Sequence, residues 1–211
     1  MVARVDGSAQ AAVMAFPSAG DGAPLHSPSH PCAGLFPRAL GRAWEGLPPA
    51  VRTLHGGRSL RASGRARVSG DMRWCAKWVR AIARLPPPAD TLELVLEIDA
   101  DATGERWLRH FGTRPMCSTL AASARHPGAL EERLGPARLT FGFEVRDARL
   151  HWRAREVRVF GIALPLRWFQ RMNASCGEYQ GRYVFDIDVH LPLVGWLVAY
   201  SGWLEPVDGA A

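Results

Sequence analysis

Three polar residues near the end of the chain have the types needed to bind a metal ion or to exchange protons. Asp186, Asp188 and His190 alternate with apolar residues in the run FDIDVH, so an extended strand would place all three on one face. At a strand rise of about 3.3 Å per residue, Asp186 and His190 lie about 13 Å apart. Metal–ligand bonds are only about 2.0–2.2 Å long, so these two could hardly share one ion. A site would need further ligands, such as His151 or Glu144; we therefore expect a solvent-exposed strand face and predict no metal site.

A second cluster, WLRHFG, has a pattern typical of ligand binding. On a strand, Trp107, Arg109 and Phe111 would share one face, with the arginine between two aromatic rings. A guanidinium held there could bind an anionic head group inside an apolar cavity. Equally, Arg109 could lie on a half-exposed face, with its aliphatic stem on apolar neighbours and its charge in water. The sequence leaves both interpretations open.

The motifs of the common enzyme classes are missing. The chain contains no G-x-G-x-x-G or G-x-x-x-x-G-K-[ST] nucleotide loop, no G-x-S-x-G and no H-E-x-x-H. Cys117 and Cys176 could act as nucleophiles only if the fold brought a histidine close to them, and buried, unreactive thiols are more common. We predict no cofactor, assign no catalytic residue and leave open whether the protein is an enzyme.

Composition and charge limit which binding partners and which cellular compartment the sequence predicts. The net charge is +6 and Lys77 is the only lysine. The strand expected around Leu60–Val68 has a basic outer face of Arg61, Arg65 and Arg67, but no aromatic residue lies among them to stack on bases, so we predict no nucleic-acid binding. The four cysteines are widely spaced, and the longest apolar run has ten residues, too few for a membrane-spanning helix. A cytoplasmic protein is the expectation.

Periodicity predicts the secondary structure. Apolar residues at mixed three- and four-residue steps predict two short helices between Leu35 and Leu54, separated by Pro48-Pro49. From Thr91 onward the period changes to two, with turn signals at DADATG and Asp147-Ala148 and a bulge expected near Arg155. We predict an α+β fold, mainly antiparallel β, of about eight strands that form a curled sheet or barrel.

One longer amphipathic helix is expected in the segment DMRWCAKWVRAIARL, with Asp71 as its N-cap. One stripe is apolar and is flanked by Trp74 and Trp78, while the opposite stripe is basic. We expect the apolar stripe to pack against the sheet or the barrel mouth. A helix on an anionic membrane surface is the second interpretation, which we do not favour.

Several of these segments together resemble a known bacterial family. The runs that carry the resemblance are FPRALGRAWEGLPPAVRTLHGG, GRARVSGDM, ERWLRHFG with RPMCS, EERLGP, VFGIALP and GRYVFDIDVHLPLVGWLVAYSGWL. From Leu35 to Pro206 the chain is similar to domain-of-unknown-function family 4166. The resemblance implies no catalytic residues, and it implies a domain that occurs alone or behind an NAD(P)-dependent reductase domain. It places Leu54-His55, Arg109, Glu132, Asp186 and Gly202–Leu204 in the family signature.

These observations combine into one functional prediction. We expect a disordered tail at 1–33, a globular domain at 34–206 and a short C-terminal tail at 207–211. The domain is predicted to bind a hydrophobic or amphipathic small molecule. The alternatives are an enzyme or accessory domain that acts with a reductase partner, and a domain that docks to a partner or a membrane. The ligand contacts that we predict are His55, Trp107, Arg109, Phe111, Glu132, Asp186, Tyr200 and Trp203.

Overall fold

The computed structural model describes residues 34–207, so the tail predicted at 1–33 and all of the C-terminal tail except Val207 lie outside the described residues. The described chain contains sixteen elements, which run through it in the following order: α1 (Leu35–Leu40), η1 (Gly41–Gly46), α2 (Pro49–Leu54), β1 (Leu60–Ser69), α3 (Trp74–Ile82), β2 (Ala89–Ala100), β3 (Gly104–Phe111), β4 (Arg114–Ala122), β5 (Leu130–Leu134), β6 (Ala137–Arg146), β7 (Arg149–Val159), β8 (Ile162–Ala163), η2 (Leu166–Phe169), β9 (Asn173–Tyr179), β10 (Arg182–Leu191) and β11 (Gly195–Pro206).

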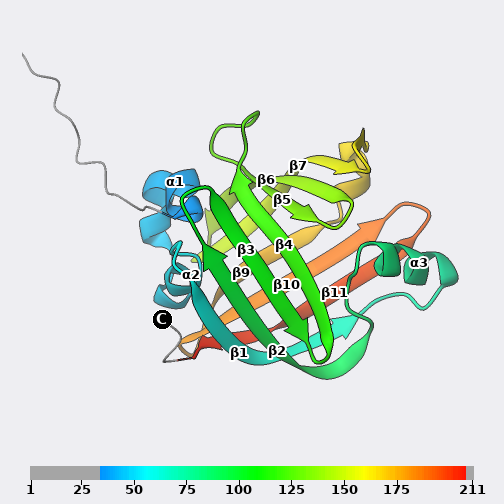
Figure 1. Cartoon of the computed structure of the whole chain (residues 1–211), viewed down its shortest axis with the longest axis horizontal. Helices are drawn as coiled ribbons and strands as arrows, with labels where there is room; N and C mark the ends of the chain where they lie inside the picture. The colour runs from blue at the N-terminus through cyan, green and yellow to red at the C-terminus, as the bar shows by residue number, and fades with distance from the viewer. Residues whose placement is uncertain (1–33, 208–211) are drawn as a thin grey trace, which may run out of the picture. The chain divides into compact units, whose positions relative to one another are not determined.

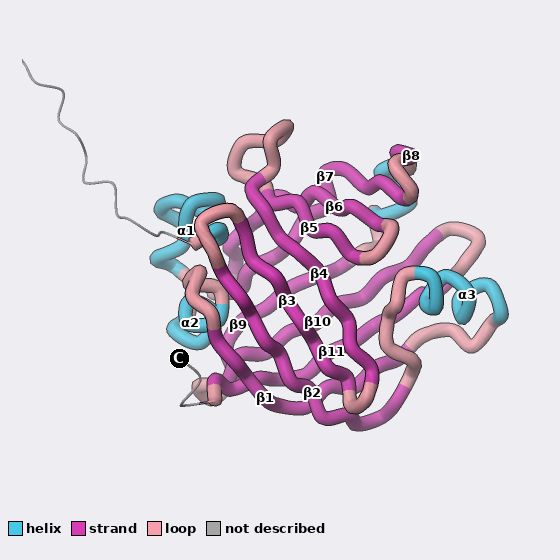
Figure 2. The backbone as a smooth tube through the Cα atoms, in the orientation of Figure 1, coloured by secondary structure: helices cyan, strands magenta, loops and turns pink. Residues whose placement is uncertain are grey.

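Ten antiparallel strands close into a barrel (Figures 1 and 2). The order around it is β6-β5-β4-β3-β2-β1-β11-β10-β9-β7, and β7 closes it by pairing with β6 along its length and with β9 at Leu150 and His151. Closure leaves no long strand edge unpaired, which removes a site of aggregation. The predicted fold class is confirmed.

The barrel has more strands than the eight expected. β9 is separate from β10, because Gln180 and Gly181 both adopt positive φ and turn the chain back on itself. The sequence NASCGEY does not predict this strand, because its small and polar residues have little β-propensity. Other predicted details are confirmed, including the turn at Asp147-Ala148 and a bulge that leaves Arg155 unpaired between Ala154 and Glu156.

Helices lie at the two ends of the barrel. The end covered by α1, η1 and α2 is called the plug end, and the opposite end, with α3, η2 and the β10–β11 turn, is called the α3 end (Figure 1). At the plug end, the fully buried Phe36 packs its ring on Trp107, Phe143 and Trp152. As predicted, Pro48-Pro49 separate the two helices.

The orientation of α3 differs from the expectation. Its packed face is formed by Ala76 and Arg80, and Arg80 Nη1 donates a hydrogen bond of 2.7 Å to the carbonyl of Leu197. Trp74 and Trp78 instead face outward, with 76% and 65% of their surface exposed. The helix packs against the barrel as predicted, and Val79 of the predicted apolar stripe contacts the core. The helix is nevertheless rotated from the expected orientation, because Met72 and Ile82 of that stripe are exposed and Arg80 of the basic stripe is buried. Ala76 permits close approach to the strands, and a buried arginine is stable when a carbonyl accepts from it.

The two ends of α3 also differ from the expectation. The helix begins at Trp74 rather than after Asp71, whose Oδ1 accepts a hydrogen bond of 3.0 Å from the Arg73 N–H. At the other end, the N–H of Leu85 reaches the carbonyl of Arg80, while Arg84 takes φ 54°. This is a Schellman ending with arginine at the position that usually holds glycine.

Candidate functional site

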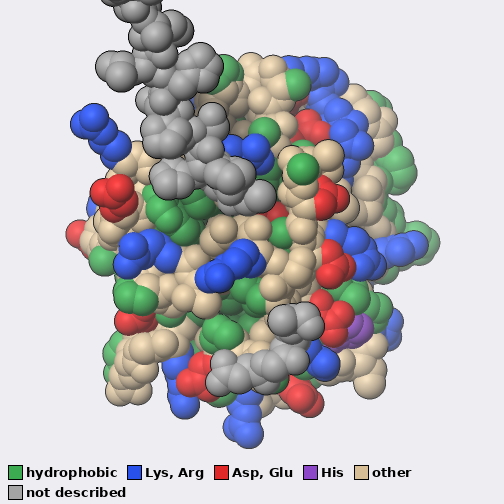
Figure 3. Space-filling view, turned by 60° about the vertical axis from the view of Figure 1, so that its left-hand side comes forward, with side chains coloured by type: hydrophobic (Ala, Val, Ile, Leu, Met, Phe, Trp, Pro, Cys, Tyr) green, Lys and Arg blue, Asp and Glu red, His purple; other side chains and the backbone are tan. Residues whose placement is uncertain are grey.

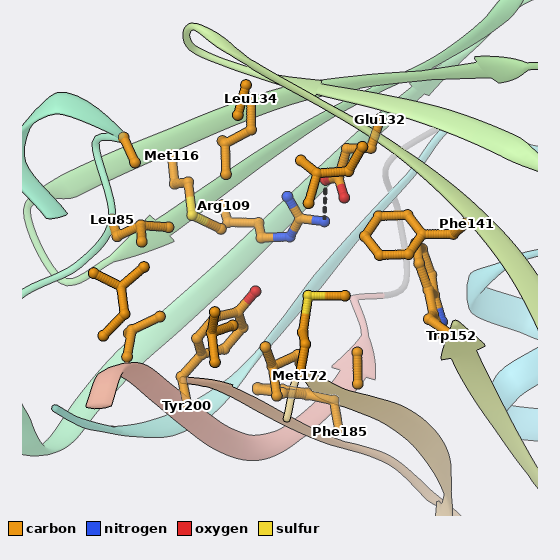
Figure 4. Close-up of a pocket in the computed structure, with 18 of the residues that line it drawn as sticks. Leu85, Arg109, Met116, Glu132, Leu134, Phe141, Trp152, Met172, Phe185 and Tyr200 are labelled. Atoms are coloured by element: carbon orange, nitrogen blue, oxygen red, sulfur yellow. Dashed lines mark ion pairs between the residues drawn. The ribbon is translucent and has the colours of Figure 1, made fainter. Parts of the chain in front are cut away.

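A cavity of about 250 Å³ lies inside the barrel. Its walls are side chains that alternate inward along the strands, and most are aliphatic or aromatic. They extend from Trp107 and Trp152, which pack on Phe36 at the plug end, to Leu134 and Leu191, the last residues of β5 and β10. Trp152 and Leu134 are among the lining residues labelled in Figure 4. Val79 and Ala83 of the α3 segment, with Phe169 and Met172 around η2, line it at the α3 end. The cavity therefore runs from the aromatic plug to the inner side of α3.

The guanidinium of Arg109 projects into this apolar space (Figure 4). Its Nη1 donates a hydrogen bond of 2.9 Å to Ser118 Oγ on β4, and its Nη2 stands 3.6 Å from Glu132 Oε1 on β5. The carbon Cζ lies 4.8 Å from the centre of the Trp107 ring, a cation–π distance. Among residues 34–207, Nε has no acceptor, whereas Nη2 already faces Glu132, so Nε is the donor left available to a ligand.

Glu132 and Tyr200 complete a polar cluster with Arg109. The side chains of Arg109 and Glu132 are only 14% and 15% exposed, so their attraction is weakly screened. Tyr200 comes from β11, and its hydroxyl points toward Arg109 from the other side of the cavity (Figure 4). Burial raises the pKa of Tyr200 above its usual value of 10, which keeps the phenol protonated. The cluster thus places a cation, an anion and a neutral hydroxyl close together in the cavity.

Behind the cavity, His55 joins a buried polar group at the plug end. His55 Nε2 lies 3.1 Å from Tyr183 Oη and 3.6 Å from Cys176 Sγ, while Nδ1 is buried without a partner among the described residues. Burial, together with the charge of Arg109, lowers the pKa of His55 to about 3. Burial also raises the pKa of Cys176 to about 11. The structure does bring a histidine to Cys176, but as a neutral imidazole beside a protonated thiol and not as the ion pair of a cysteine nucleophile.

Glu105 is a buried carboxyl group that the sequence analysis did not single out. Its Oε2 accepts a hydrogen bond of 2.8 Å from the indole N–H of Trp107, and Oε1 has no partner among the described residues. Burial raises the pKa of Glu105. Glu105, Trp107 and Arg109 alternate on the inner face of β3, so the period of two could have indicated it. Its hydrogen bond orients the indole ring of Trp107, which lines the cavity.

The structure brings together five of the eight predicted contact residues in the cavity, namely Trp107, Arg109, Phe111, Glu132 and Tyr200. His55 lies behind the cavity wall. Asp186 and Trp203 lie on the outer face of the barrel, because Phe185, Ile187 and Leu204 take the inward positions of their strands. The stacking of Trp203 under Arg182, at 4.4 Å, shows this orientation directly. Neither residue reaches the cavity.

The polar residues of FDIDVH form local contacts on the outer face of β10. Asp188 Oδ1 accepts a hydrogen bond of 2.8 Å from the indole of Trp196 and lies 3.2 Å from His190 Nε2. Within residues 34–207, no group of three or more His, Cys, Asp or Glu side chains is arranged to hold a metal ion. No helix in the same range is both long and apolar enough to cross a bilayer.

The fold and the cavity define the class: a closed antiparallel β-barrel with an apolar interior, one buried arginine–glutamate pair and helices at both ends. Residues 47–204 match the family model described as Domain of unknown function (DUF4166). The chain belongs to this family. Comparison with curated proteins found no match, and comparison with solved structures found none either.

Proposed function

We propose that the barrel binds a small molecule with an apolar body and a carboxylate head group. The observation that carries this proposal is the placement of Arg109, Glu132 and Tyr200 inside a cavity whose other walls are almost entirely apolar. A mostly apolar pocket with a few convergent polar groups is the usual form of a small-molecule site. Burying two charged side chains is costly, so their retention in an otherwise apolar interior favours a binding role.

A carboxylate is the head group that the unused donors fit best. Among the described residues, Arg109 Nε has no acceptor and Nη2 has only Glu132 Oε1, at 3.6 Å. A ligand carboxylate that draws Nη2 away from Glu132 would accept two parallel hydrogen bonds from the guanidinium. The protonated hydroxyl of Tyr200 provides a third donor on the opposite side. Ser118 and Glu132 hold the guanidinium in place, and Glu132 neutralises it when no ligand is bound.

The volume limits the length of the apolar body. A cavity of about 250 Å³ holds about eight water-sized groups, which corresponds to a medium-length alkyl chain or one small ring system. Longer chains would extend toward the α3 end, where Val79 and Met172 line the cavity. Decanoate is the probe: its ten carbons slightly exceed this volume, so its terminal carbons would extend toward the α3 end.

Calorimetric titration with decanoate, decanol and decyltrimethylammonium tests the proposal. A charge-assisted hydrogen bond contributes about 1.5–3 kcal/mol, so decanoate should bind about tenfold or more tightly than decanol, and the cation should bind weakest. The double variant Arg109→Met/Glu132→Gln replaces both charges together and avoids a lone buried charge. It should retain decanol binding and lose the preference for decanoate. The double variant Arg61→Gln/Glu97→Gln, on the outer wall, is the matched control and should bind as the wild type does.

A cavity-filling variant locates the ligand. Ala174→Phe places a ring in the cavity and should abolish binding of both decanoate and decanol, whereas Ala121→Phe on the exposed face should not. If none of the three probes binds, or if Ala174→Phe leaves binding intact, the proposal is wrong.

Tyr200 supports a second candidate, an enzyme or accessory domain that acts with an NAD(P)-dependent reductase partner. A neutral phenol beside a carboxylate is an acid–base pair suited to proton transfer next to a ligand carbonyl. A ketone handled in this way would be a substrate for such a partner. The test is deuterium incorporation beside the carbonyl of bound 2-decanone, followed by NMR. Incorporation should be lost in Tyr200→Phe while binding remains; no incorporation by the wild type would exclude this candidate.

A further inference from the structure

The exposed apolar side chains of the described chain are concentrated at the α3 end. Nine of the eleven large ones lie there, on α3 and the segment before it, the β7–β8 hairpin, η2, and the β10–β11 turn with the start of β11: Met72, Trp74, Trp78, Ile82, Phe160, Ile162, Leu166, Leu193 and Trp196. The other two, Tyr179 and Val207, lie at the plug end. On the side turned forward in Figure 3, which carries α1 and α2, acidic and basic side chains are interspersed.

The outward face of α3 is held in place by its inward face. Trp74, Trp78 and Ile82 follow one another at four-residue steps and so form one exposed stripe. On the inward side, Arg80 is hydrogen-bonded to Leu197, and Arg73 Nη2 donates a hydrogen bond of 2.8 Å to the carbonyl of Val194. Both bonds fix the helix against β11 and the β10–β11 turn, so the tryptophans cannot rotate inward without breaking them.

The charges around this apolar rim are mainly positive. Five exposed cations there have no salt bridge within residues 34–207: Lys77, Arg84, Arg114, Arg167 and Arg171. The carboxylates nearby are mostly engaged, such as Asp71 with Arg73, and Glu131 with Arg133 and Arg138. Asp90 and Glu93, near the start of β2, are the exposed exceptions.

We propose that the α3 end docks onto an anionic lipid surface and that the cavity exchanges its ligand there. Tryptophans and aliphatic side chains among cations suit the head-group region of a bilayer, where apolar groups insert and cations meet anionic lipids. The apolar residues also lie on four separate segments, and Leu193 is 93% exposed on the β10–β11 turn. Such protruding tips suit insertion into lipid better than a flat protein interface, whose core is closely packed.

The docking surface is continuous with the cavity. Val79, on the side of α3 between the tryptophan stripe and the barrel, lines the cavity, and so do Ala83, Leu164 and Met172. An amphipathic molecule leaving a bilayer under α3 would therefore pass from lipid to the cavity wall along apolar side chains. This exchange rests on the proposed function; the docking does not.

Vesicle flotation tests the docking directly. The full chain is mixed with vesicles of phosphatidylcholine alone or of phosphatidylcholine with phosphatidylglycerol, and the floated fraction is measured at low and high salt. We expect binding at least about tenfold stronger to the anionic vesicles and weakened by salt. Trp74→Ser/Trp78→Ser should reduce it about tenfold or more, and Lys77→Gln/Arg84→Gln should reduce it on anionic vesicles only. Tyr179→Ser/Val207→Ser, at the plug end, is the matched apolar control, and Arg42→Gln/Arg52→Gln, on η1 and α2 at the plug end, is the matched charge control.

The outcomes separate docking from ligand binding. Absence of flotation with anionic vesicles, or flotation unchanged by the tryptophan substitutions, would overturn the docking proposal. A concentration-dependent dimer that the same substitutions dissociate would overturn it in favour of a second copy of the chain. Decanoate binding is measured without vesicles, so its failure would remove the cavity proposal while leaving the docking result to stand alone.

Discussion

His55 makes the stability of the barrel depend on pH in a way that can be calculated. Its ring is fully buried between Phe36 and Trp107 and shares a hydrogen bond with Tyr183 Oη. The pKa of His55 falls from 6.5 to about 3 on folding, because burial and the nearby Arg109 disfavour the charged ring. The folded protein therefore keeps His55 neutral at pH values where the unfolded chain protonates it.

The sign and the size of the effect follow from this difference. Between the two pKa values the unfolded chain binds one more proton, so the free energy of unfolding falls as the pH is lowered below 6.5. The slope is about 1.4 kcal/mol per pH unit, which gives a loss of about 2.5 kcal/mol between about pH 7 and pH 4.5. Domains are typically stable by about 5–15 kcal/mol, so the loss is a large fraction of the total.

Urea unfolding at several pH values, for the wild type and His55→Gln, measures this term. The glutamine amide can hydrogen-bond to Tyr183 and does not titrate. Burial raises the pKa of Glu105 and lowers that of His151, and these groups also change stability with pH, but both are present in each protein and cancel in the difference. When the pH is lowered from about 7 to 4.5, the free energy of unfolding of the wild type should fall by about 2.5 kcal/mol more than that of the variant. A difference in free energy of unfolding that stays constant over this pH range would refute a buried, neutral His55.

Two further predictions follow from local structure. Arg84 adopts φ 54° at the end of α3, so Arg84→Gly should raise the free energy of unfolding by about 0.5–1 kcal/mol in urea titration, whereas Arg114→Gly, in strand β4, should lower it. The Cys176 thiol is buried and its pKa is raised to about 11, so the folded protein should react with iodoacetamide at Cys117, which is exposed, and not at Cys176. Peptide mass mapping measures both cysteines, and rapid labelling of Cys176 without unfolding would contradict the packing of the plug end.

Most strands are predictable from the sequence because their signal is local. In β2 and β6, apolar side chains recur at every second position, which only an extended chain with one buried face explains. The proline pair at Pro48-Pro49 and the turn at Asp147-Ala148 are local in the same sense. β9 is not predictable in this way, because its sequence NASCGEY has no apolar alternation. Its extended conformation is stabilised by pairing with β10.

The candidate site was predicted only in part, for a related reason. Arg109 between Trp107 and Phe111 indicated an inward-facing cation, but its partners Ser118 and Glu132 come from two other strands. Tyr200 reaches the cluster from a fourth. The pairing of distant strands brings these residues together, and the periodicity of one strand contains no information about it.

By itself, the sequence determined most of the extended segments, the main turns, and the inward face of strands with a clear apolar alternation such as β2 and β6. Only the tertiary structure decided that ten strands close into a barrel, that an apolar cavity remains inside it, and that Asp186 and Trp203 lie outside. It also decided that α3 turns Trp74 and Trp78 to solvent. The alternation of side chains along a strand is fixed by backbone geometry within a few residues. The packed face of α3, in contrast, depends on the hydrogen bond from Arg80 to the carbonyl of Leu197, which lies 117 residues away in the sequence.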